Sequence, residues 1–522
     1  MMLSWLTGSK PDHPMADMKK ARELVAELLG SDSLRVLEES ASWLDSVGGA
    51  EGFKLDHRLA LVDLLDRGAK SHQSRLGQEY LDAPRLQKTY ESRLWKASFG
   101  FWKMLGTAYL RCIEQFQAGA PGSGAVKKDL PMMVGRALRA LTVQLKWILL
   151  RYGLIEDRIW RDLGRAYAFA ESQGFAAQRA VIYLGPHGES SAQEEFLKAL
   201  MLVMSSPDSL PPLKLHIAER AVAHFGSRFA LQAKAAPGCH FFFDLSMHQP
   251  PARAHKGMAL GPMVRFFGAG DAAEGLRDLV RAVGKKDGVP IGVNLGGNFD
   301  KETVLSVLAH LEQYWADKPP LRTKQRRDLA TRITVVPRFP EIVRWLDAVM
   351  DTSSLEFSDP ATSESWIVFN ASDGGYGAIV PQIKGDWLRI GSLLAVRTET
   401  ATACRVGIIR RFTKDRYDQQ RVGIQVLGNV ALPVQLLFAE QAAASNTSRL
   451  GKPAVLLSDK PDQNGEVAVV MRAGSFAQKQ SLQMRVRDKA YLLSPVGLTE
   501  GGEDFDWARF KVVKPLQEQL VK

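Results

Sequence analysis

A change in the spacing of apolar residues divides this chain of 522 residues and limits what each part can fold into. Between residues 17 and 226, apolar residues recur every three or four positions, which is the period of an amphipathic helix. Beyond residue 331 they occur in short alternating runs bounded by turn residues, as in half-buried strands. The sequence therefore predicts a multidomain α+β protein, with an all-α N-terminal domain and β structure in the C-terminal half.

The part between these two patterns mixes both of them. Residues 240–246, 263–267 and 289–294 predict strands, whereas residues 272–283 and 301–315 predict helices. The many short strands after residue 331 are typical of a small antiparallel barrel. We therefore expect a helical domain over residues 1–226, a mixed α/β segment over 227–316, a β-barrel over 317–445 and a β-rich C-terminal extension over 446–522.

Two segments of the helical domain, residues 102–109 and 160–167, share the pattern Trp-x-x-Leu-Gly-x-x-Tyr. This pattern matches the opening of the tetratricopeptide consensus, but the two segments are too far apart for consecutive repeats of about 34 residues. In either copy the glycine would give a partner helix room to approach. The segments predict tight helix packing, with a helical-repeat surface for a protein partner as the alternative.

Composition and charge favour a soluble protein of the cytoplasm that binds anions. The longest apolar runs are far shorter than the ~18 residues of a membrane span, and the N-terminus lacks the basic region of a secretory signal. Three widely spaced cysteines do not form a disulfide framework and fit a reducing compartment. The net charge of +11 favours nucleotides, nucleic acid or a membrane surface as partners.

Two short motifs flank the first strand of the expected barrel. The first, Arg322-x-x-x-Arg326 followed by Arg327, comes after Pro319-Pro320 and is expected to form an extended basic linker. The second, Asn370-x-Ser372-x-x-Gly375, follows a strand that ends at residue 369. An amide, a hydroxyl and flexible glycines at a strand end can present hydrogen-bonding groups to a ligand in a tight turn.

Together these motifs resemble the signature of the PilZ domain family of cyclic di-GMP receptors, over about residues 320–440. The resemblance implies a β-barrel that binds cyclic di-GMP without catalysing a reaction. It implies that Arg322 and Arg326 clamp guanine bases and phosphates, with Arg327 as a third contact. The planar fork of arginine suits this role, because it can bond the O6 and N7 edge of guanine in two places and neutralise phosphate.

The resemblance also gives roles to the second motif. Asn370 and Ser372 would hydrogen-bond a guanine or its phosphate, and Gly375 would keep the floor of the site open. A second register places Arg327 and Arg332 at the barrel entrance, and it fits the family spacing less well. The leading hypothesis is a signalling receptor in which cyclic di-GMP orders the basic linker and reorients the barrel relative to a helical domain that binds an unknown protein.

Two other functions remain as alternatives. A nucleic-acid-binding protein would use the same basic linker, with an affinity that falls steeply as salt rises. A helical interaction scaffold would carry a degenerate barrel that binds no nucleotide.

Signals for metal binding or catalysis are weak. Cys239, His240, Asp244, His248 and His255 cluster in sequence, but their spacing fits no standard metal site. The chain lacks the nucleophile-elbow and zinc-protease motifs, and the barrel region has no histidine to act as an acid or base. We therefore expect no enzyme activity, no metal and no cofactor other than the cyclic di-GMP ligand.

Overall fold

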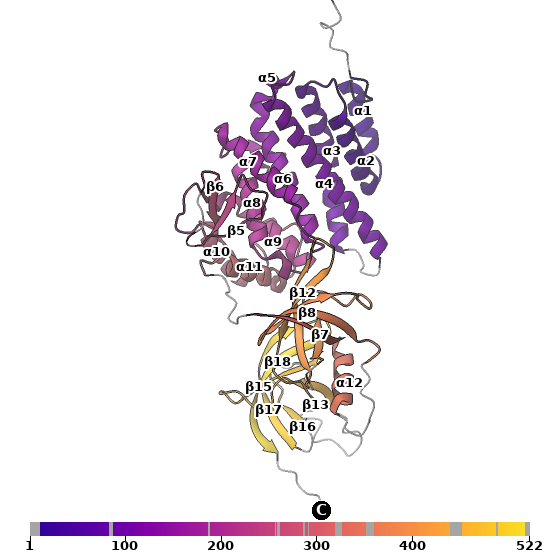
Figure 1. Ribbon diagram of the computed structural model, residues 1–522, viewed down its shortest axis with the longest axis vertical. Coiled ribbons are helices and arrows are strands. Elements are labelled where there is room, and N and C mark those ends of the chain that lie inside the picture. Colours follow the sequence, from indigo (N-terminus) through magenta and orange to yellow (C-terminus); the bar gives the residue numbers. More distant parts are fainter. Residues whose placement is uncertain are drawn as a thin grey trace, which may run out of the picture. The chain divides into compact units, whose positions relative to one another are not determined.

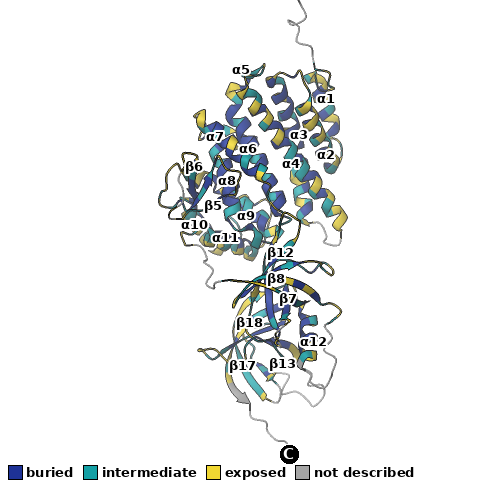
Figure 2. Cartoon of the chain, in the orientation of Figure 1, coloured by how far each residue is buried: buried dark blue, intermediate teal, exposed yellow. Residues whose placement is uncertain are grey.

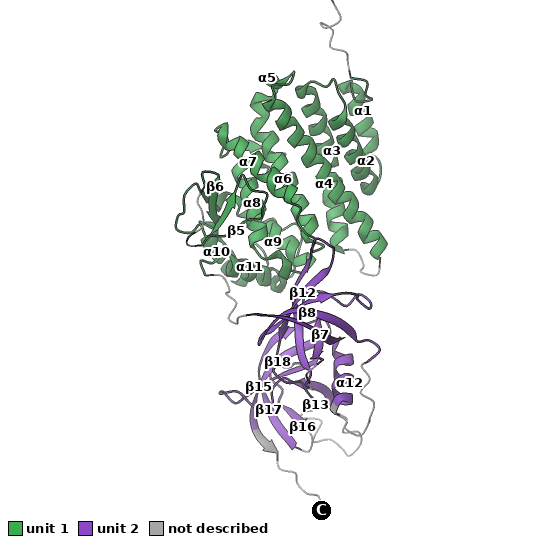
Figure 3. Ribbon diagram, in the orientation of Figure 1, with its two compact units in different colours: residues 1–321 green, residues 322–522 purple. Residues whose placement is uncertain are grey.

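The computed structural model describes residues 11–82, 87–185, 188–255, 257, 261–285, 288–290, 292–318, 326–350, 360–399, 401, 403–438, 451–486 and 489–516. Over these residues the chain divides into two compact units, unit 1 (Met1–Leu321) and unit 2 (Arg322–Lys522), which Figure 3 shows in separate colours. Helices dominate unit 1 and strands dominate unit 2 (Figure 1). The predicted multidomain α+β class is confirmed.

Unit 1 begins with a bundle of helices, of which α3, α4 and α6 lie side by side (Figure 1). Aspartate or serine side chains accept backbone N–H bonds at the start of α1, α2, α8 and α11, which explains where these helices begin. The helices of unit 1 are α1 (Met18–Leu28), α2 (Ser33–Gly49), α3 (Leu55–Asp82), α4 (Lys88–Gln117), α5 (Ser123–Val126), α6 (Leu130–Leu149), α7 (Asp157–Ser172), α8 (Ala192–Met204), α9 (Pro212–His224), α10 (Ala272–Lys285) and α11 (Lys301–Trp315).

The glycines of the two Trp-x-x-Leu-Gly segments allow close packing. A Cβ atom on Gly106 of α4 would lie 2.7 Å from Nε2 of Gln144 on α6. A Cβ atom on Gly164 of α7 would lie 2.8 Å from the carbonyl oxygen of Leu245. The tryptophans of both segments are almost fully buried, and Figure 2 shows the inner faces of these helices in dark blue. Both segments therefore contribute to packing inside unit 1.

The mixed segment after residue 226 packs against these helices, since one core of buried residues runs from Met15 to Trp315. Its antiparallel sheet has the strand order β3-β6-β4-β5. A separate short hairpin, β1-β2, precedes α8. The strands of unit 1 are β1 (Ala180–Val181), β2 (Glu189–Ser190), β3 (Ala230–Gln232), β4 (Phe241–Asp244), β5 (Ala252–Arg253) and β6 (Val264–Gly268).

The strand predicted over residues 289–294 was wrong: its described residues form no strand. Pro290 has no N–H to donate to a neighbouring strand, and Gly292 has φ +99°. Val289 and Val293 are apolar because they pack against the core of unit 1.

A buried polar network joins α3, α4 and α6 to the β1-β2 hairpin. Arg136 of α6 pairs with Asp66 of α3 at 3.2 Å and donates to the carbonyl of Ile182 at 2.7 Å. The hydroxyls of Tyr109 and Tyr183 donate to the same carboxylate, at 2.8 Å and 3.1 Å. Burial raises the pKa of Asp66, and Arg136 opposes that rise. The network satisfies charges that would otherwise be costly to bury.

Over its described residues, unit 2 consists of two closed antiparallel barrels of six strands each. In the first barrel, neighbouring strands follow the order β10-β11-β12-β9-β8-β7, with β7 and β10 paired to close it. Its strands are β7 (Arg327–Pro337), β8 (Glu364–Ser372), β9 (Gly375–Val380), β10 (Leu393–Thr398), β11 (Arg405–Lys414) and β12 (Gln420–Val426). The alternating apolar runs after residue 331 thus form strands, as predicted.

The second barrel follows directly. Its strands are β13 (Leu432–Phe438), β14 (Lys452–Leu456), β15 (Glu466–Arg472), β16 (Leu482–Val486), β17 (Lys489–Gly501) and β18 (Phe505–Leu516). The boundary expected at residue 445 lies after β13, which pairs with β14 and β16 of the second barrel.

Helix α12 (Phe339–Met350), which follows β7, packs against both barrels. Its Trp345 and Leu346 belong to one cluster of buried residues that includes Ile408 of the first barrel and Val470 and Phe505 of the second. An ion pair between Arg410 and Glu500 and a bond from the Phe339 N–H to Asp504 also join the barrels. The two barrels thus share a core.

Replacing Glu364 with alanine is expected to destabilise unit 2 by roughly 2–5 kcal/mol, because it leaves two buried donors without an acceptor. The carboxylate of Glu364 accepts the indole N–H groups of Trp366 and Trp387, each at 2.9 Å, and the backbone N–H of Lys384. Urea unfolding followed by tryptophan fluorescence measures the change. Glu399→Ala, at an exposed position, is the matched control. An equal effect in both variants would contradict the assignment.

Candidate functional site on the first barrel

The arginines of the predicted site lie where the chain enters the first barrel. Arg322 lies outside the described residues, while Arg326 is half-buried and directly precedes β7. Arg327 is exposed as the first residue of β7, opposite Ala371 of β8. Side chains alternate between the two faces of a strand, and this alternation, continued by one residue, places Arg326 on the same face as Asn370 and Ser372.

The second motif forms the hairpin between β8 and β9. Asn370 and Ser372 are the last outward-facing residues of β8, and both are half-buried. The two-residue turn Asp373-Gly374 then leads into Gly375, which lies opposite Ser372. Aspartate followed by glycine is a favoured pair for so tight a hairpin. The structure therefore brings Arg326, Arg327, Asn370 and Ser372 to one end of β7 and β8.

The strand register extends this site across the outer face of the barrel. Asp328, Asn370, Gly377, Gly423 and Arg411 are paired in turn across β7, β8, β9, β12 and β11, and we call this set the outer row. Adjacent strands are about 4.8 Å apart, so the row spans roughly 19 Å. It offers carboxylate and amide acceptors at one end and a guanidinium at the other.

Asn370 has an unused acceptor. Its Oδ1 atom is buried and accepts no hydrogen bond from any described residue. The side chain lies over Gly377, where a Cβ atom would be 2.4 Å from that oxygen. A buried carbonyl without a partner costs about 1–3 kcal/mol, so a ligand that donates a hydrogen bond here would recover that free energy.

Gly375 has a packing role in the barrel. A Cβ atom at this position would lie 2.0 Å from the carbonyl oxygen of Ile424 on β12. The residue is buried, and its missing side chain lets β9 and β12 approach each other. Gly423, a half-buried residue of the outer row beside Arg411, also has no side chain to cover this face of the barrel.

An aromatic ring and a guanidinium lie beside the outer row. The Arg421 guanidinium carbon is 5.4 Å from the centre of the Phe369 ring, and the ring approaches the Cβ position of Gly377 to 2.8 Å. Arg421 Nη2 donates to Asp415 at 3.0 Å, whereas its buried Nε donates to none of the described residues. Stacked rings and guanidinium groups are surfaces on which a nucleotide base can lie.

The charge of Asp415 is stabilised in this setting. Desolvation alone would raise its pKa, but the backbone N–H groups of Tyr417 and Gln419 and the Arg421 guanidinium lower the pKa of Asp415 below its ordinary value. Asp415 therefore stays ionised and holds Arg421 beside the aromatic ring.

Sequence reasoning did not identify Asp328, Phe369, Arg411 and Arg421 as members of the site. Their contribution depends on the order β7-β8-β9-β12-β11, which pairs strands far apart along the chain. The sequence did give one indication of this face, in Gly377 and Gly423. A glycine in the middle of an alternating strand leaves the sheet without a side chain at that position.

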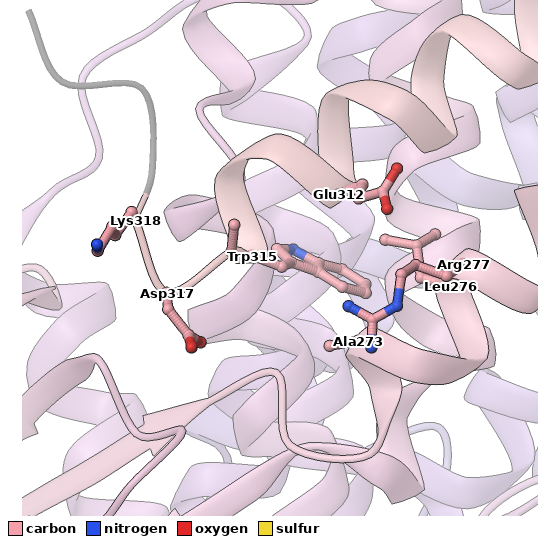
Figure 4. A pocket seen from close by; sticks show the side chains of 8 residues that line it. Ala273, Leu276, Arg277, Glu312, Trp315, Asp317 and Lys318 are labelled. Carbon is pink, nitrogen blue, oxygen red and sulfur yellow. The ribbon is translucent and has the colours of Figure 1, made fainter.

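Unit 1 ends beside a cavity of about 440 Å³. Figure 4 shows Trp315, the last residue of α11, facing Leu276 and Arg277 of α10, with Asp317 on the segment that leaves the helix. His240 Nε2 donates to Asp317 Oδ1 at 2.8 Å. This bond joins Asp317, near the end of unit 1, to the residue that precedes β4. After Lys318 the chain continues towards Arg326.

The part of the chain that the structure describes shows neither a metal cluster nor a membrane-spanning helix. No three His, Cys, Asp or Glu side chains converge there in a way that could hold a metal ion. Cys239 is buried, and the neighbouring His240 is engaged with Asp317. None of the described helices combines the length and the apolar character needed to cross a bilayer.

The fold and the outer row describe a two-unit α+β protein whose first barrel presents groups suited to a nucleotide. Comparison with known families adds a finding about unit 1. Residues 19–236 match the family described as "Cyclic-di-GMP receptor FimW, N-terminal domain". The match covers less than half of the chain and ends before the first barrel. No curated protein matches the chain.

Proposed function

We propose that this protein is a non-catalytic receptor for cyclic di-GMP and that the ligand binds at the outer row of a PilZ-like first barrel. Two independent observations support this. The N-terminal helices are similar to a domain of a cyclic di-GMP receptor, and the first barrel carries Arg326 beside the Asn370-x-Ser372 motif. The observation that most supports the proposal is the buried Oδ1 of Asn370. It lies on the outer row near Arg326 and accepts no hydrogen bond from any described residue.

The chemistry of guanine matches the groups of the site. Guanine presents donors on its Watson–Crick edge, which suit the carboxylate of Asp328 and the free Oδ1 of Asn370. Its O6 and N7 acceptors and the ligand's phosphates suit Arg326 and Arg411, while Arg327, paired with Ala371, lies on the opposite face of β7.

Binding would act as a switch by changing how the two units are arranged. Cyclic di-GMP held by the segment before β7 and by the barrel would favour one arrangement of unit 2 relative to unit 1. To switch effectively, the ligand must prefer that arrangement by a few kcal/mol, and a micromolar site corresponds to about 8 kcal/mol in total. Unit 1 would pass the change on to a protein partner.

Calorimetric titration of the full chain with cyclic di-GMP tests the site. We expect saturable binding that weakens about tenfold or more in Arg326→Ala and Ser372→Ala, because each variant loses a contact to the ligand. GTP is the nucleotide control, and Arg472→Ala, at an exposed position on the second barrel, is the matched variant.

The same titration separates the alternatives. Loss of binding in Arg332→Ala with full binding in Arg326→Ala would move the site to the second register. No heat from the unaltered protein at high ligand concentration would refute the receptor function.

A further inference from the structure

Unit 1 has a groove between α4 and α7 that the proposed nucleotide site does not use. Its volume is about 600 Å³, and Leu245 and Met263 of the small sheet region close one side of it. We call it the α4–α7 groove. Its lining comprises Thr107, Leu110, Arg111, Ile113, Glu114, Gln117, Arg158, Arg161, Asp162, Arg165, Ala166, Ala168, Phe169, Ser172, Leu245 and Met263.

The α7 wall of the groove is basic. Arg158, Arg161 and Arg165 follow one another at intervals of three and four residues, which places them on one face of the helix. Their side chains are 26%, 38% and 61% exposed, so the guanidinium groups line the groove from its floor to its rim.

The carboxylates of the lining engage these arginines only in part. Asp162 Oδ1 lies 2.9 Å from Arg161 Nε, but Asp162 Oδ2 is 3.7 Å from Arg158 Nη1. Glu114 is 3.8 Å from Arg165. Arg158 Nη2 is buried and donates to no atom of the described residues. A buried donor left unpaired is costly, so the groove favours an acidic occupant.

The floor of the groove is apolar. Leu110 and Ile113 of α4, Phe169 of α7 and Leu245 belong to its lining, and Gly164 lets the Leu245 carbonyl approach α7. Met263 is 36% exposed at the edge. Apolar side chains of an occupant would therefore be removed from water here, while its charges meet the arginine wall.

The shape of the groove suits a helix. The lining residues extend over positions 107–117 of α4 and 158–172 of α7, which corresponds to walls of about 15 Å and about 21 Å at the α-helical rise. Walls of this length accommodate roughly ten to fourteen residues of a third helix. Amphipathic helices bind such grooves through apolar residues spaced three and four positions apart.

We propose that the α4–α7 groove is the docking site for an acidic amphipathic helix of a partner protein. This inference rests on the proposed function, because it identifies the surface through which unit 1 would pass on the nucleotide signal. Carboxylates flanking the apolar stripe of that helix would pair with Arg158, Arg161 and Arg165.

Selection of a phage-displayed library of random peptides of about 15 residues against the full chain tests this proposal. We expect enrichment of sequences with apolar residues at helical spacing and flanking Glu or Asp. One enriched peptide, made synthetically, should bind the unaltered protein in fluorescence anisotropy and bind Arg161→Glu/Arg165→Glu about tenfold more weakly or worse. Lys20→Glu/Arg22→Glu, at two exposed positions of α1, is the charge-matched control.

Each other outcome counts against the proposal. Enriched peptides without an acidic helical pattern, or equal binding to the double variant, would overturn it. So would displacement of the peptide by cyclic di-GMP that persists in Arg326→Ala, which would make the groove itself a nucleotide site. A dimer that Arg161→Glu/Arg165→Glu converts to a monomer would assign the groove to a second copy of the chain. The milder Arg161→Gln/Arg165→Gln checks that the double reversal acts through charge rather than misfolding.

Calorimetry with cyclic di-GMP on the same variants keeps the two hypotheses apart. The α7 variants should bind the nucleotide as the unaltered protein does, since the outer row lies in unit 2. Nucleotide binding without peptide binding refutes only the docking site, and the converse refutes only the nucleotide site.

Discussion

Replacing Asn370 with leucine is expected to weaken cyclic di-GMP binding by roughly 5- to 150-fold without destabilising unit 2. The change removes a buried carbonyl that no described residue satisfies and puts an apolar group of similar shape in its place. The lost affinity corresponds to about 1–3 kcal/mol for a ligand hydrogen bond. The free energy of unfolding should stay the same or rise by up to about 1 kcal/mol. Calorimetry and urea unfolding of the same preparation measure both quantities.

Asn370→Asp is the matched control, because it keeps an acceptor at the same place and the PilZ signature admits either residue. We expect it to retain binding. Unchanged affinity in Asn370→Leu would exclude Asn370 from the site. Lost affinity together with a large loss of stability would show that Asn370 serves the β8-β9 hairpin rather than the ligand.

Replacing Arg136 with methionine is expected to destabilise unit 1 by about 3–5 kcal/mol. The guanidinium is 1% exposed and the Asp66 carboxylate 2% exposed, so the variant would leave a buried negative charge stabilised by two tyrosine hydroxyls and the charge of Lys70 alone. Denaturation followed by far-ultraviolet circular dichroism, which is dominated by the helices of unit 1, measures the loss.

The loss should depend on pH in a defined direction. Burial already raises the pKa of Asp66, and removing Arg136 raises it further. An acid whose pKa is higher in the folded than in the unfolded chain binds more protons when folded, so stability increases as pH falls through the folded pKa towards the unfolded pKa. The deficit of Arg136→Met should therefore shrink in acid, and Asp66→Asn added to it should recover much of the stability. A deficit independent of pH would show that lost packing, not the buried charge, is responsible. Arg22→Met, at an exposed position of α1, is the control.

The sequence was most informative where the apolar period is regular. The helical spacing before residue 226 and the alternating runs after residue 331 correctly predicted the α+β class. The strand near 289–294 was misjudged because a short apolar run does not reveal whether its residues pair with another strand or pack singly on a core. Pro290 and Gly292 were the local evidence against a strand.

The candidate site was predictable only in part, because a motif records which residues are neighbours along the chain and not which strands pair. Asn370 and Ser372 are neighbours along one strand, which a motif can express, whereas Arg326 comes near them only because β7 pairs with β8. The positions of Asp328, Arg411 and Arg421 depend on strand pairing between distant segments, and a single sequence carries little information on register. The sequence suggested an open floor at Gly375, but in the barrel that position is filled by the approach of β12.

The cluster that contains Trp345, Val470 and Phe505 also bears on how this chain could be recombined with others. Its side chains come from α12 and both barrels, so cutting the chain after β12 would strip one side of that cluster and expose apolar surface to water. The first barrel is therefore not an interchangeable module. A biosensor grafted from it would need both barrels, and an evolutionary duplication or loss would have to involve the pair together.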